Sequence, residues 1–347
     1  MKISYVSTQA TSNSLRQNIR QLQNDILRRQ QEVSSGRLAD YGRTLGTRSG
    51  ELTGTKLTLD RLSTIIDTNA LAGSRLEVTQ HGIGQIRAYT EQLMTAMTAG
   101  MSQELGRAAV LETAKQTLLG IEDVINLGFN GQNVFGGFNT DGKVTDGFAN
   151  SPAKAAFDTA FQTYFGFTKD DPAAGYIDAT AMRDFLDTVV TPQFFGSDWS
   201  TNYSNATDNG IVSRITLTQM QVTSFSANED GFRGAVMAAA IASELFDSAV
   251  GQAALVTVAE KAIELGGQAN ADLADVQGRA GVSQEQLSRA SVRLEAQYSL
   301  LEERIAGLEN IDQFEASTSL SGLLTQLEIS FSLTTRIQQL SIMNYLS

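Results

Sequence analysis

The residues of this chain that could carry out chemistry are few and scattered. The sequence has one histidine, His81, and no cysteine. A single histidine without cysteine gives neither a multi-histidine metal site nor a thiol–imidazole pair. The lack of cysteine also excludes disulfide bonds. We therefore expect no catalytic residue, no metal site and no bound cofactor.

Two short segments resemble ligand-binding loops, but each lacks a defining residue. Residues 131–137, Gly-Gln-Asn-Val-Phe-Gly-Gly, have the glycine spacing of a phosphate-binding loop without the lysine and the serine or threonine that should follow. Residues 139–142, Asn-Thr-Asp-Gly, resemble the start of a calcium loop, but no glutamate occupies the twelfth position. We interpret both segments as turns.

The charge balance and the apolar pattern exclude two further classes of partner. The net charge is −12, whereas nucleic acid is bound mainly through Lys and Arg, so we expect no nucleic-acid partner. No stretch approaches the roughly 20 apolar residues that cross a bilayer, so we expect no membrane insertion. Residues 1–15 have neither a basic start nor an apolar run, and we expect no cleavable signal peptide.

Proline and the aromatic residues divide the chain into two flanks and a distinct middle. All three prolines, Pro152, Pro172 and Pro192, lie in the middle, as do 13 of the 16 phenylalanines. Flanks without proline and with few aromatic residues are typical of long helices. We predict a mostly α fold: a long antiparallel helical bundle or coiled-coil rod built from both chain ends, with a small mixed α/β inserted domain.

Apolar residues recur at helical spacing over both flanks. The N-terminal flank is predicted to form helices over about residues 15–33, with Gly36 as the stop, over 52–97 and over 103–127. In the C-terminal flank, residues 287–308 form a seam typical of one helix packed along another. A last helical run begins near Leu320.

The middle of the chain has a different pattern. Residues 153–165 and 179–190 are predicted to form short helices, and the alternating Val, Ile and Thr residues of 211–226 favour one or two strands. The turn residues 228–231 then precede a helix over about 232–246.

The two terminal segments have weak local support for helix formation. Residues 317–347 contain seven serines and four threonines, which are poorer helix formers than Ala or Leu. Ordering one residue costs roughly 1–2 kcal/mol, and burying one Leu or Ile returns roughly 1.5–3 kcal/mol. With an apolar residue at every third or fourth position, the free energy gained by burial in a lone helix is about equal to or smaller than the cost of ordering it. We predict that both ends are flexible in the monomer and become helical on assembly.

We predict that the terminal apolar stripes form the assembly interface. The last helical run carries two stripes, which indicates two packing surfaces. Eight basic and three acidic residues precede residue 51, whereas four acidic and one basic residue occur from Glu309 onward, so pairing of the two ends is electrostatically favourable. The predicted interface residues are Leu15, Ile19, Leu22, Ile26, Val33, Leu320, Leu324, Leu327, Phe331, Leu333, Ile337 and Leu340.

Motifs at both ends resemble bacterial flagellins and their relatives. Residues 316–321 (Ala-Ser-Thr-Ser-Leu-Ser), 323–328 (Leu-Leu-Thr-Gln-Leu-Glu) and 336–346 (Arg-Ile-Gln-Gln-Leu-Ser-Ile-Met-Asn-Tyr-Leu) are similar to the end of flagellins. Residues 33–38 (Val-Ser-Ser-Gly-Arg-Leu) resemble the flagellin N-terminal motif. Residues 130–141 (Asn-Gly-Gln-Asn-Val-Phe-Gly-Gly-Phe-Asn-Thr-Asp) resemble a segment typical of the hook–filament junction members of this family, the third hook-associated proteins.

One connector departs from the family pattern. The N-terminal Ser-Gly motif of the family is usually followed by an Asp-rich stretch. Here residues 39–49, Ala-Asp-Tyr-Gly-Arg-Thr-Leu-Gly-Thr-Arg-Ser, replace it. The departure leaves the local structure of this connector open and points to a divergent subfamily.

The resemblance implies a structural subunit of the flagellum with three domains. Residues 1–45 with 310–347 would form a helical assembly domain, residues 46–128 with 229–309 a helical rod domain, and residues 129–228 the small inserted domain. Such a subunit would form a homo-oligomeric ring between another hook-associated protein on the hook side and flagellin on the filament side. It would be extracellular, exported without a cleaved signal peptide, after a cytoplasmic chaperone has bound its C-terminal segment.

Two other functions remain open from the sequence. A filament flagellin would share the terminal motifs, although the 130–141 segment and the small middle disfavour it. A coiled-coil adhesin or signalling rod would share the helical flanks, but it predicts a membrane anchor or an export signal, and neither is seen.

Overall fold

The computed structural model describes residues 8–102 and 106–346, and the side chains of residue 10, residues 13–102 and residues 106–336. The chain forms two units, one from segments 1–63 and 295–347 and one from residues 64–294. The predicted fold class is confirmed, because long helices packed together make up most of the structure and the sheets are small and antiparallel.

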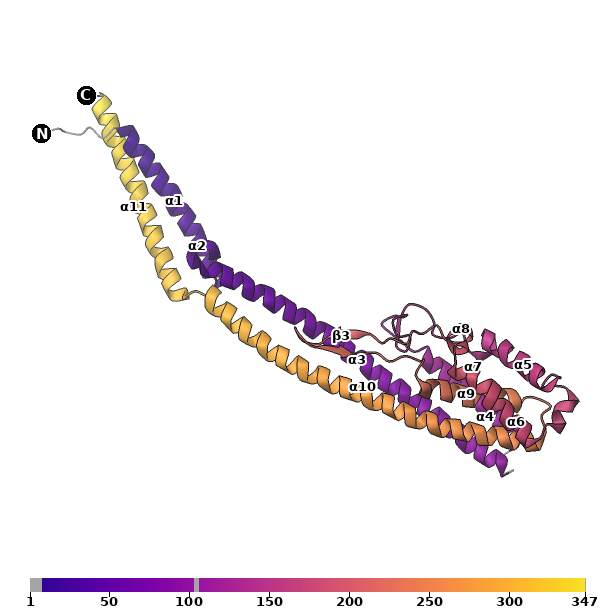
Figure 1. Cartoon of the computed structure of the whole chain (residues 1–347). Coiled ribbons are helices and arrows are strands. Elements are labelled where there is room, and N and C mark those ends of the chain that lie inside the picture. Colours follow the sequence, from indigo (N-terminus) through magenta and orange to yellow (C-terminus); the bar gives the residue numbers. More distant parts are fainter. Residues whose placement is uncertain (1–7, 103–105, 347) are drawn as a thin grey trace. The chain divides into compact units, whose positions relative to one another are not determined.

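The first unit is built from both chain ends. It contains α1 (Thr8–Ser35), α2 (Tyr41–Leu45), the first turns of α3 (Arg48–Met101), the last turns of α10 (Gln252–Glu309) and α11 (Gln313–Leu346). Helices α1 and α11 lie side by side (Figure 1). The less exposed side chains of α11 recur at helical spacing and define the stripe that faces α1: Ala316, Leu320, Leu323, Leu327, Ser330 and Thr334.

The predicted stop of the first helix is confirmed. Helix α1 ends at Ser35, and Gly36 follows with a φ of +71°. This left-handed conformation is favourable only for glycine and is a common way to end a helix. The Gly36 N–H donates to the Glu32 carbonyl over 2.8 Å, which satisfies a carbonyl at the helix end.

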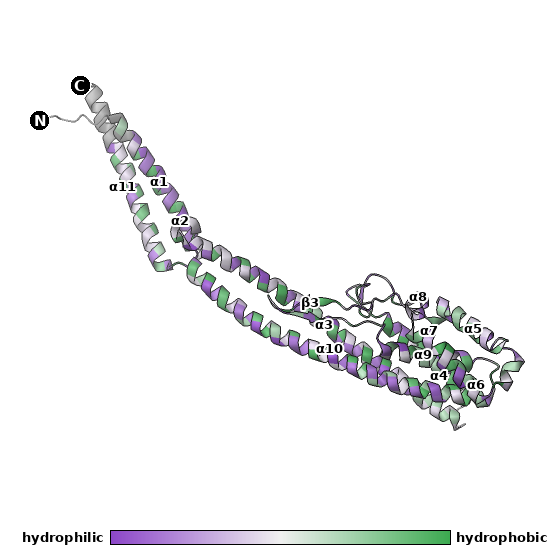
Figure 2. Cartoon of the chain, viewed as in Figure 1, coloured by the Kyte–Doolittle hydropathy of each residue, from purple (hydrophilic) through white to green (hydrophobic). Residues whose placement is uncertain are grey.

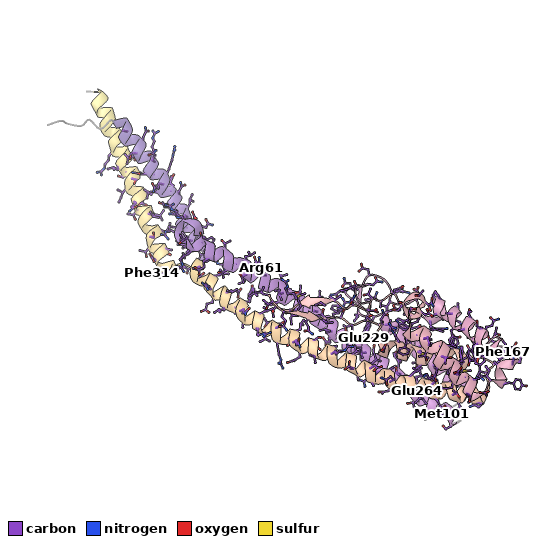
Figure 3. All side chains as sticks on the ribbon, viewed as in Figure 1. Arg61, Met101, Phe167, Glu229, Glu264 and Phe314 are labelled. Carbon is purple, nitrogen blue, oxygen red and sulfur yellow. The ribbon has the colours of Figure 1, made fainter. Side chains whose placement is uncertain are left out.

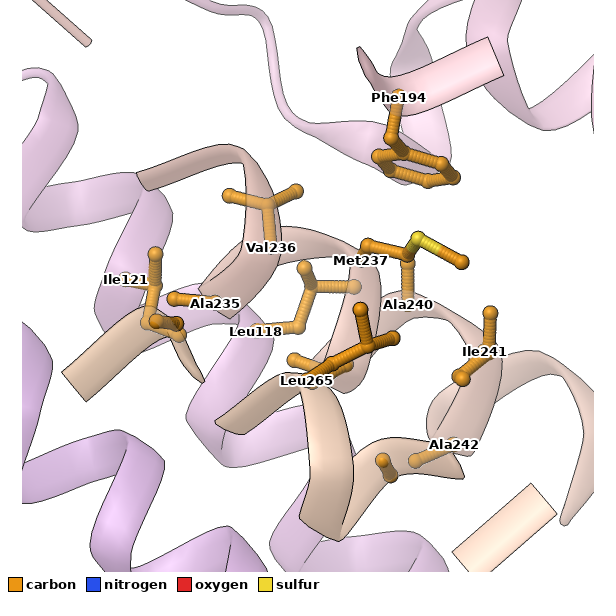
Figure 4. Packing of buried hydrophobic residues seen from close by; sticks show 14 of the residues in the cluster. Leu118, Ile121, Phe194, Ala235, Val236, Met237, Ala240, Ile241, Ala242 and Leu265 are labelled. Atoms are coloured by element: carbon orange, nitrogen blue, oxygen red, sulfur yellow. The ribbon is translucent and has the colours of Figure 1, made fainter. Parts of the chain in front are cut away.

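A helical bundle forms the centre of the second unit. It consists of α3 from residue 64 onward, α4 (Arg107–Ile125), α9 (Asp230–Leu245) and α10 up to residue 294. Residues 235–242 of α9 are all buried, as expected for a helix that is apolar on every side. Figure 4 shows α9 residues packed among Leu118 and Ile121 of α4, Leu265 of α10 and Phe194.

Short helices and aromatic rings form the middle of the second unit. The helices are α5 (Pro152–Phe165), α6 (Ala179–Phe185), α7 (Thr191–Phe195) and α8 (Asp198–Asn202), with the π-helical turn η3 (Leu186–Val190) and the 3₁₀ turns η1 (Phe148–Asn150) and η2 (Pro172–Tyr176). Buried rings pack edge to face, with 6.1 Å between the centroids of Phe157 and Phe185. The phenylalanine-rich middle is therefore an aromatic core.

Two small hairpins complete the second unit. Strands β1 (Gly128–Phe129) and β2 (Gln132–Asn133) pair across Asn130 and Gly131, whose φ values are +51° and +78°. Positive φ at both turn positions is the type I′ hairpin geometry that Asn-Gly favours. Strands β3 (Val212–Arg214) and β4 (Met220–Val222) pair with Val212 opposite Val222. The strands predicted within residues 211–226 are therefore confirmed as a two-stranded hairpin.

Candidate assembly interface

The predicted interface residues lie on α1 and α11. Those on α1 are half-buried at helical spacing: Leu15, Ile19, Leu22, Ile26 and Val33. On α11, Leu320 and Leu327 are half-buried on the stripe that faces α1. In contrast, Leu324, Phe331 and Leu333 are 46–48% exposed. The predicted Ile337 and Leu340 lie where side chains are outside the described residues.

The first unit has very little core of its own. Among its described side chains, only four apolar ones are buried: Leu52, Leu62, Leu308 and Ala316. Twice as many large apolar side chains are exposed: Leu27, Leu57, Leu300, Phe314, Leu324, Ile329, Phe331 and Leu333. Apolar and polar residues alternate along both α1 and α11 in Figure 2. This distribution leaves apolar surface available for contact with other molecules.

Sequence reasoning missed several of these exposed side chains. Phe314 is 83% exposed in the first turn of α11, where Figure 3 labels it, and Leu27 and Leu300 are about two-thirds exposed. A signal for Phe314 was present, because Asp312 precedes it at a helix start. The Asp312 carboxylate accepts the Phe314 N–H over 2.8 Å, so the cap orders the turn that carries the aromatic ring.

The two helix breaks of the first unit are hydrogen-bonded to each other. The Leu38 N–H donates to the Glu309 carbonyl over 2.8 Å, and the Ile311 N–H donates to the Gly36 carbonyl over 3.1 Å. These bonds satisfy backbone groups that the helix ends leave free. They hold the junction of α1 with α2 against the junction of α10 with α11.

A buried carboxylate reinforces this pairing of the breaks. Glu309 is 2% exposed and forms ion pairs with Arg37 over 3.6 Å and with Lys56. The nearby Glu32 is equally buried, and its carboxylate accepts the Ala39 N–H over 3.3 Å and pairs with Arg29 over 2.9 Å. A buried carboxylate is tolerated only with such partners.

We expect Glu309→Gln to weaken the contact between the α1–α2 junction and the α10–α11 junction. Removing the charge weakens the contacts to Arg37 and Lys56 by about 1–2 kcal/mol. Amide hydrogen exchange at Leu38 and Ile311 should then be faster by roughly 5–30-fold. Glu303→Gln is the matched control, because Glu303 is exposed on the same helix and has no ion pair among the described residues. Equal exchange rates at Leu38 and Ile311 in both variants would show that the Glu309 carboxylate does not hold the two junctions together.

The divergent connector forms a short capped helix. The Asp40 carboxylate accepts the Arg43 N–H over 3.0 Å and caps α2. Gly46, with a φ of +56°, ends α2, and α3 begins at Arg48. The Lys56 amine lies 5.0 Å from the centre of the Tyr41 ring, a cation–π distance. The connector is therefore ordered by local capping and by contact with the first turns of α3.

Residues 130–141 form an anchored loop in the second unit. Phe135 is buried, with its ring centroid 5.1 Å from that of Phe232. The Arg75 guanidinium donates to the Asn133 carbonyl over 2.6 Å. At Gly137, with a φ of +65°, a Cβ atom would lie 2.4 Å from the Thr207 carbonyl oxygen, so only glycine fits.

Several backbone donors of residues 130–141 are already engaged within the protein. The Asn133, Val134 and Asn139 N–H groups donate to backbone carbonyls, and the Phe138 N–H donates to the Thr207 hydroxyl over 2.7 Å. A phosphate loop needs such donors pointing at the ligand. Gly131 lies in the tight turn between β1 and β2.

His81 is exposed on α3. No group of three or more His, Cys, Asp or Glu side chains converges within residues 8–102 and 106–346 in a way that could hold a metal ion.

Glu122 is buried, and its carboxylate accepts the Phe148 N–H over 2.6 Å and the Tyr203 hydroxyl over 3.3 Å. These contacts join α4 to the middle segment.

Burial raises the pKa of Glu122, against the smaller lowering effect of its hydrogen bonds. A raised pKa in the folded state means that the folded carboxyl binds its proton more tightly than the unfolded one. Its contribution to stability is therefore full below the unfolded pKa, near 4.3, and is lost as the pH rises through the raised folded pKa. Above the folded pKa, the buried ionised carboxylate lowers the stability of the folded protein.

We accordingly expect Glu122→Gln to be at least as stable as the natural protein at pH 7. The amide oxygen can still accept from Phe148 and Tyr203, and it avoids the desolvation of a charge. The natural protein should gain stability as the pH falls through the folded pKa of Glu122, and the variant should not. Urea unfolding across this range measures the effect, with Glu112→Gln, exposed on the same helix, as the control. A large loss of stability in Glu122→Gln at pH 7 would contradict this prediction.

Comparison with protein families accounts for most of the helical flanks. The family model of the bacterial flagellin N-terminal helical region matches residues 6–140, and that of the bacterial flagellin C-terminal helical region matches residues 263–346. Together they match more than half of the chain. The chain belongs to the flagellin family. Flagellin-family proteins are structural subunits of the bacterial flagellum, an extracellular organelle.

A solved structure extends the comparison of this flagellin-family chain to its fold. A protein from Vibrio parahaemolyticus, described as a flagellar hook-associated protein, is similar with a TM-score of 0.52 and 9% sequence identity. The match covers 76% of this chain and 97% of that one, and at such low identity it shows a shared fold alone. No curated protein matches the sequence. Among the described residues, no helix has the length and apolar character needed to cross a membrane.

Proposed function

We propose that this flagellin-family chain is the junction subunit between the hook and the filament of the bacterial flagellum, and that it is not an enzyme. It assembles as a homo-oligomeric ring, with another hook-associated protein on the hook side and flagellin on the filament side. A cytoplasmic chaperone binds its C-terminal segment before export, which uses no cleaved signal peptide. The three domains expected from the sequence stay part of this proposal.

The observation that carries the junction assignment is the segment 130–141. This segment resembles the junction members of the family, and its loop is fixed to the rest of the second unit. Phe135 is inserted in the core and Gly137 is placed where a side chain cannot fit. Phe138, in contrast, is 60% exposed. Its backbone is held through Thr207, so the ring is presented on a rigid loop, as aromatic anchors of protein interfaces often are.

The composition of the first unit supports assembly through the terminal helices. Among the described side chains of this unit only four apolar ones are buried, whereas eight large apolar ones are exposed. Neighbouring subunits would bury the exposed residues, among them Leu324, Ile329 and Phe331. We therefore expect contacts with other copies to stabilise this unit.

A filament flagellin is the second candidate within the family. The two family models match terminal regions that a filament subunit would also contain. The amount of protein in sheared flagella separates the candidates, because a filament subunit is the major component and a junction subunit is a minor one. The adhesin and signalling-rod alternative is set aside by the family membership.

The experiment that tests the proposal is deletion of the gene followed by electron microscopy of the cells. A junction subunit predicts hooks without filaments and flagellin secreted into the medium. Filaments of altered shape or length on the hooks would identify one of several flagellins instead. Normal flagella would reject both functions.

A further inference from the structure

One face of the β3–β4 hairpin is fixed to the helices of the second unit. Ile215, just after β3, is fully buried and clusters with Ala72, Leu287 and Ala290. The Asn69 side-chain amide donates to the Ile215 carbonyl over 3.0 Å. These contacts hold the hairpin against α3 and α10, so its orientation is not free.

The opposite face of this hairpin is apolar and uncovered. Side chains alternate across a strand, so Val212, Arg214, Met220 and Val222 share the outer face. Val212 is 47% exposed, Met220 53% and Val222 42%, and Val212 and Val222 are directly opposite each other. Exposed apolar side chains gathered on one face favour contact with another molecule there.

A groove lies between the turn of the hairpin and α10. Gln219 of the hairpin turn and Arg289, Val292 and Arg293 of α10 line it, and Val292 is 63% exposed. The hairpin and the groove together form what we term the hairpin patch: Val212, Arg214, Met220, Val222, Val292 and Arg293.

The hairpin patch is positively charged on an acidic chain. Arg214 and Arg293 are exposed, and neither forms an ion pair within the part of the chain that the structure describes. Arg289 is paired with Glu285 over 2.6 Å. The whole chain has a net charge of −12, so another copy of it offers acidic surface to these free arginines.

Helix α3 carries one exposed acidic and one exposed apolar side chain on the side away from the hairpin. Asn69 and Ala72 point toward the hairpin and α10. At about 100° per residue, Asp67 and Leu71 lie on the other side of the helix. Leu71 is 53% exposed and Asp67 is exposed without an ion pair among the described residues. The hairpin patch and this face of α3 therefore have opposite charges and both expose apolar side chains. They point away from each other within one copy.

We propose that the hairpin patch of one copy docks on the Asp67–Leu71 face of α3 in a second copy of this chain. Arg214 and Arg293 meet Asp67, while Met220 and the valines cover Leu71. Because the two surfaces differ and lie on opposite sides of α3, the contact repeats from copy to copy and builds a ring or a helical array. The proposal rests on the proposed function, since it specifies one contact within that assembly.

The lack of native cysteine makes crosslinking a direct test. Full-length chain carrying Met220→Cys and Leu71→Cys is produced in the deletion strain, and sheared flagella are treated with a short bis-maleimide reagent. We expect dimers and higher multimers of the chain. The control pair Met220→Cys and Tyr176→Cys places the second cysteine at a side chain that is 91% exposed but outside the proposed face, and it should give none.

The outcomes separate this contact from the proposed function. Incorporation of the chain into flagella without crosslinks from the Met220 and Leu71 pair overturns the docking alone. A crosslink from Met220→Cys to a different protein also overturns it. Absence of the natural chain from flagella overturns the proposed function, and the docking with it.

A charge exchange gives an independent measure of the same contact. Arg214→Glu with Arg293→Glu places like charges opposite Asp67 and should lower the crosslink yield by about tenfold or more. Adding Asp67→Arg restores opposite charges and should recover most of the yield. Since these side chains are exposed, the thermal unfolding of the free protein should stay unchanged. Loss of yield without recovery would contradict the proposed pairing.

Discussion

Replacing Leu324 and Phe331 by Asp should abolish filament attachment while leaving the free protein folded. Both side chains are nearly half exposed and lie seven residues apart, on one flank of α11 beside the stripe that faces α1. Their burial between subunits is worth roughly 1.5–3 kcal/mol each, so the affinity between copies should fall by about a hundredfold or more. In the free protein neither substitution opens a cavity, and the melting temperature should change little.

The measurement has two parts, one for each half of this prediction. Electron microscopy of the deletion strain complemented with the variant should show hooks without filaments, and thermal unfolding of the purified variant should match the natural protein. Thr95→Asp with Thr188→Asp is the control, since it adds the same two charges at exposed threonines of the second unit. Normal filaments in the Leu324 and Phe331 variant would refute an interface on this flank.

Replacing Asn228 by Ala should destabilise the second unit by about 3–5 kcal/mol. The Asn228 side-chain oxygen accepts the Trp199 indole N–H over 2.7 Å and the Ser204 hydroxyl over 2.8 Å. Its amide donates to the Ala206 carbonyl over 3.0 Å and to the Asp208 carboxylate over 2.8 Å. Trp199 is 1% exposed, so the variant leaves a buried donor without a partner.

Thermal unfolding measures this loss, which corresponds to a fall of roughly 10 °C for a unit of this size. Asn209→Ala is the matched control, because the Asn209 side chain is exposed nearby and makes no hydrogen bond among the described residues. The control should melt within a few degrees of the natural protein. Similar melting of both variants would mean that the Asn228 network contributes little.

The two largest predictions concern different requirements of an assembly subunit. The second unit has its own core, and Asn228 fixes how the loop after α8 returns to α9. The first unit has little core, and residues such as Leu324 are predicted to find their partners on other copies. We expect the first unit to be completed only when neighbouring copies bury its exposed apolar side chains.

The sequence alone determined the helical flanks, the compact middle and the family. These features are local, because helical spacing, the stop at Gly36 and the placement of proline depend on residues close together in the chain. Local signals also place the ends of elements only approximately. Helix α3 begins at Arg48 rather than near residue 52, and helix α4 begins at Arg107 rather than near residue 103.

Only the tertiary structure decided which apolar side chains are buried and which are exposed. The apolar residues of α11 look alike in the sequence, yet Leu327 faces α1 while Phe331 is exposed. Asn228, expected to help open a helix, instead bonds Trp199 and Ser204, and the Leu38 N–H bonds a carbonyl 271 positions later in the chain, at Glu309. Such contacts depend on which distant segments meet, and that is set by packing of the whole chain rather than by any local pattern.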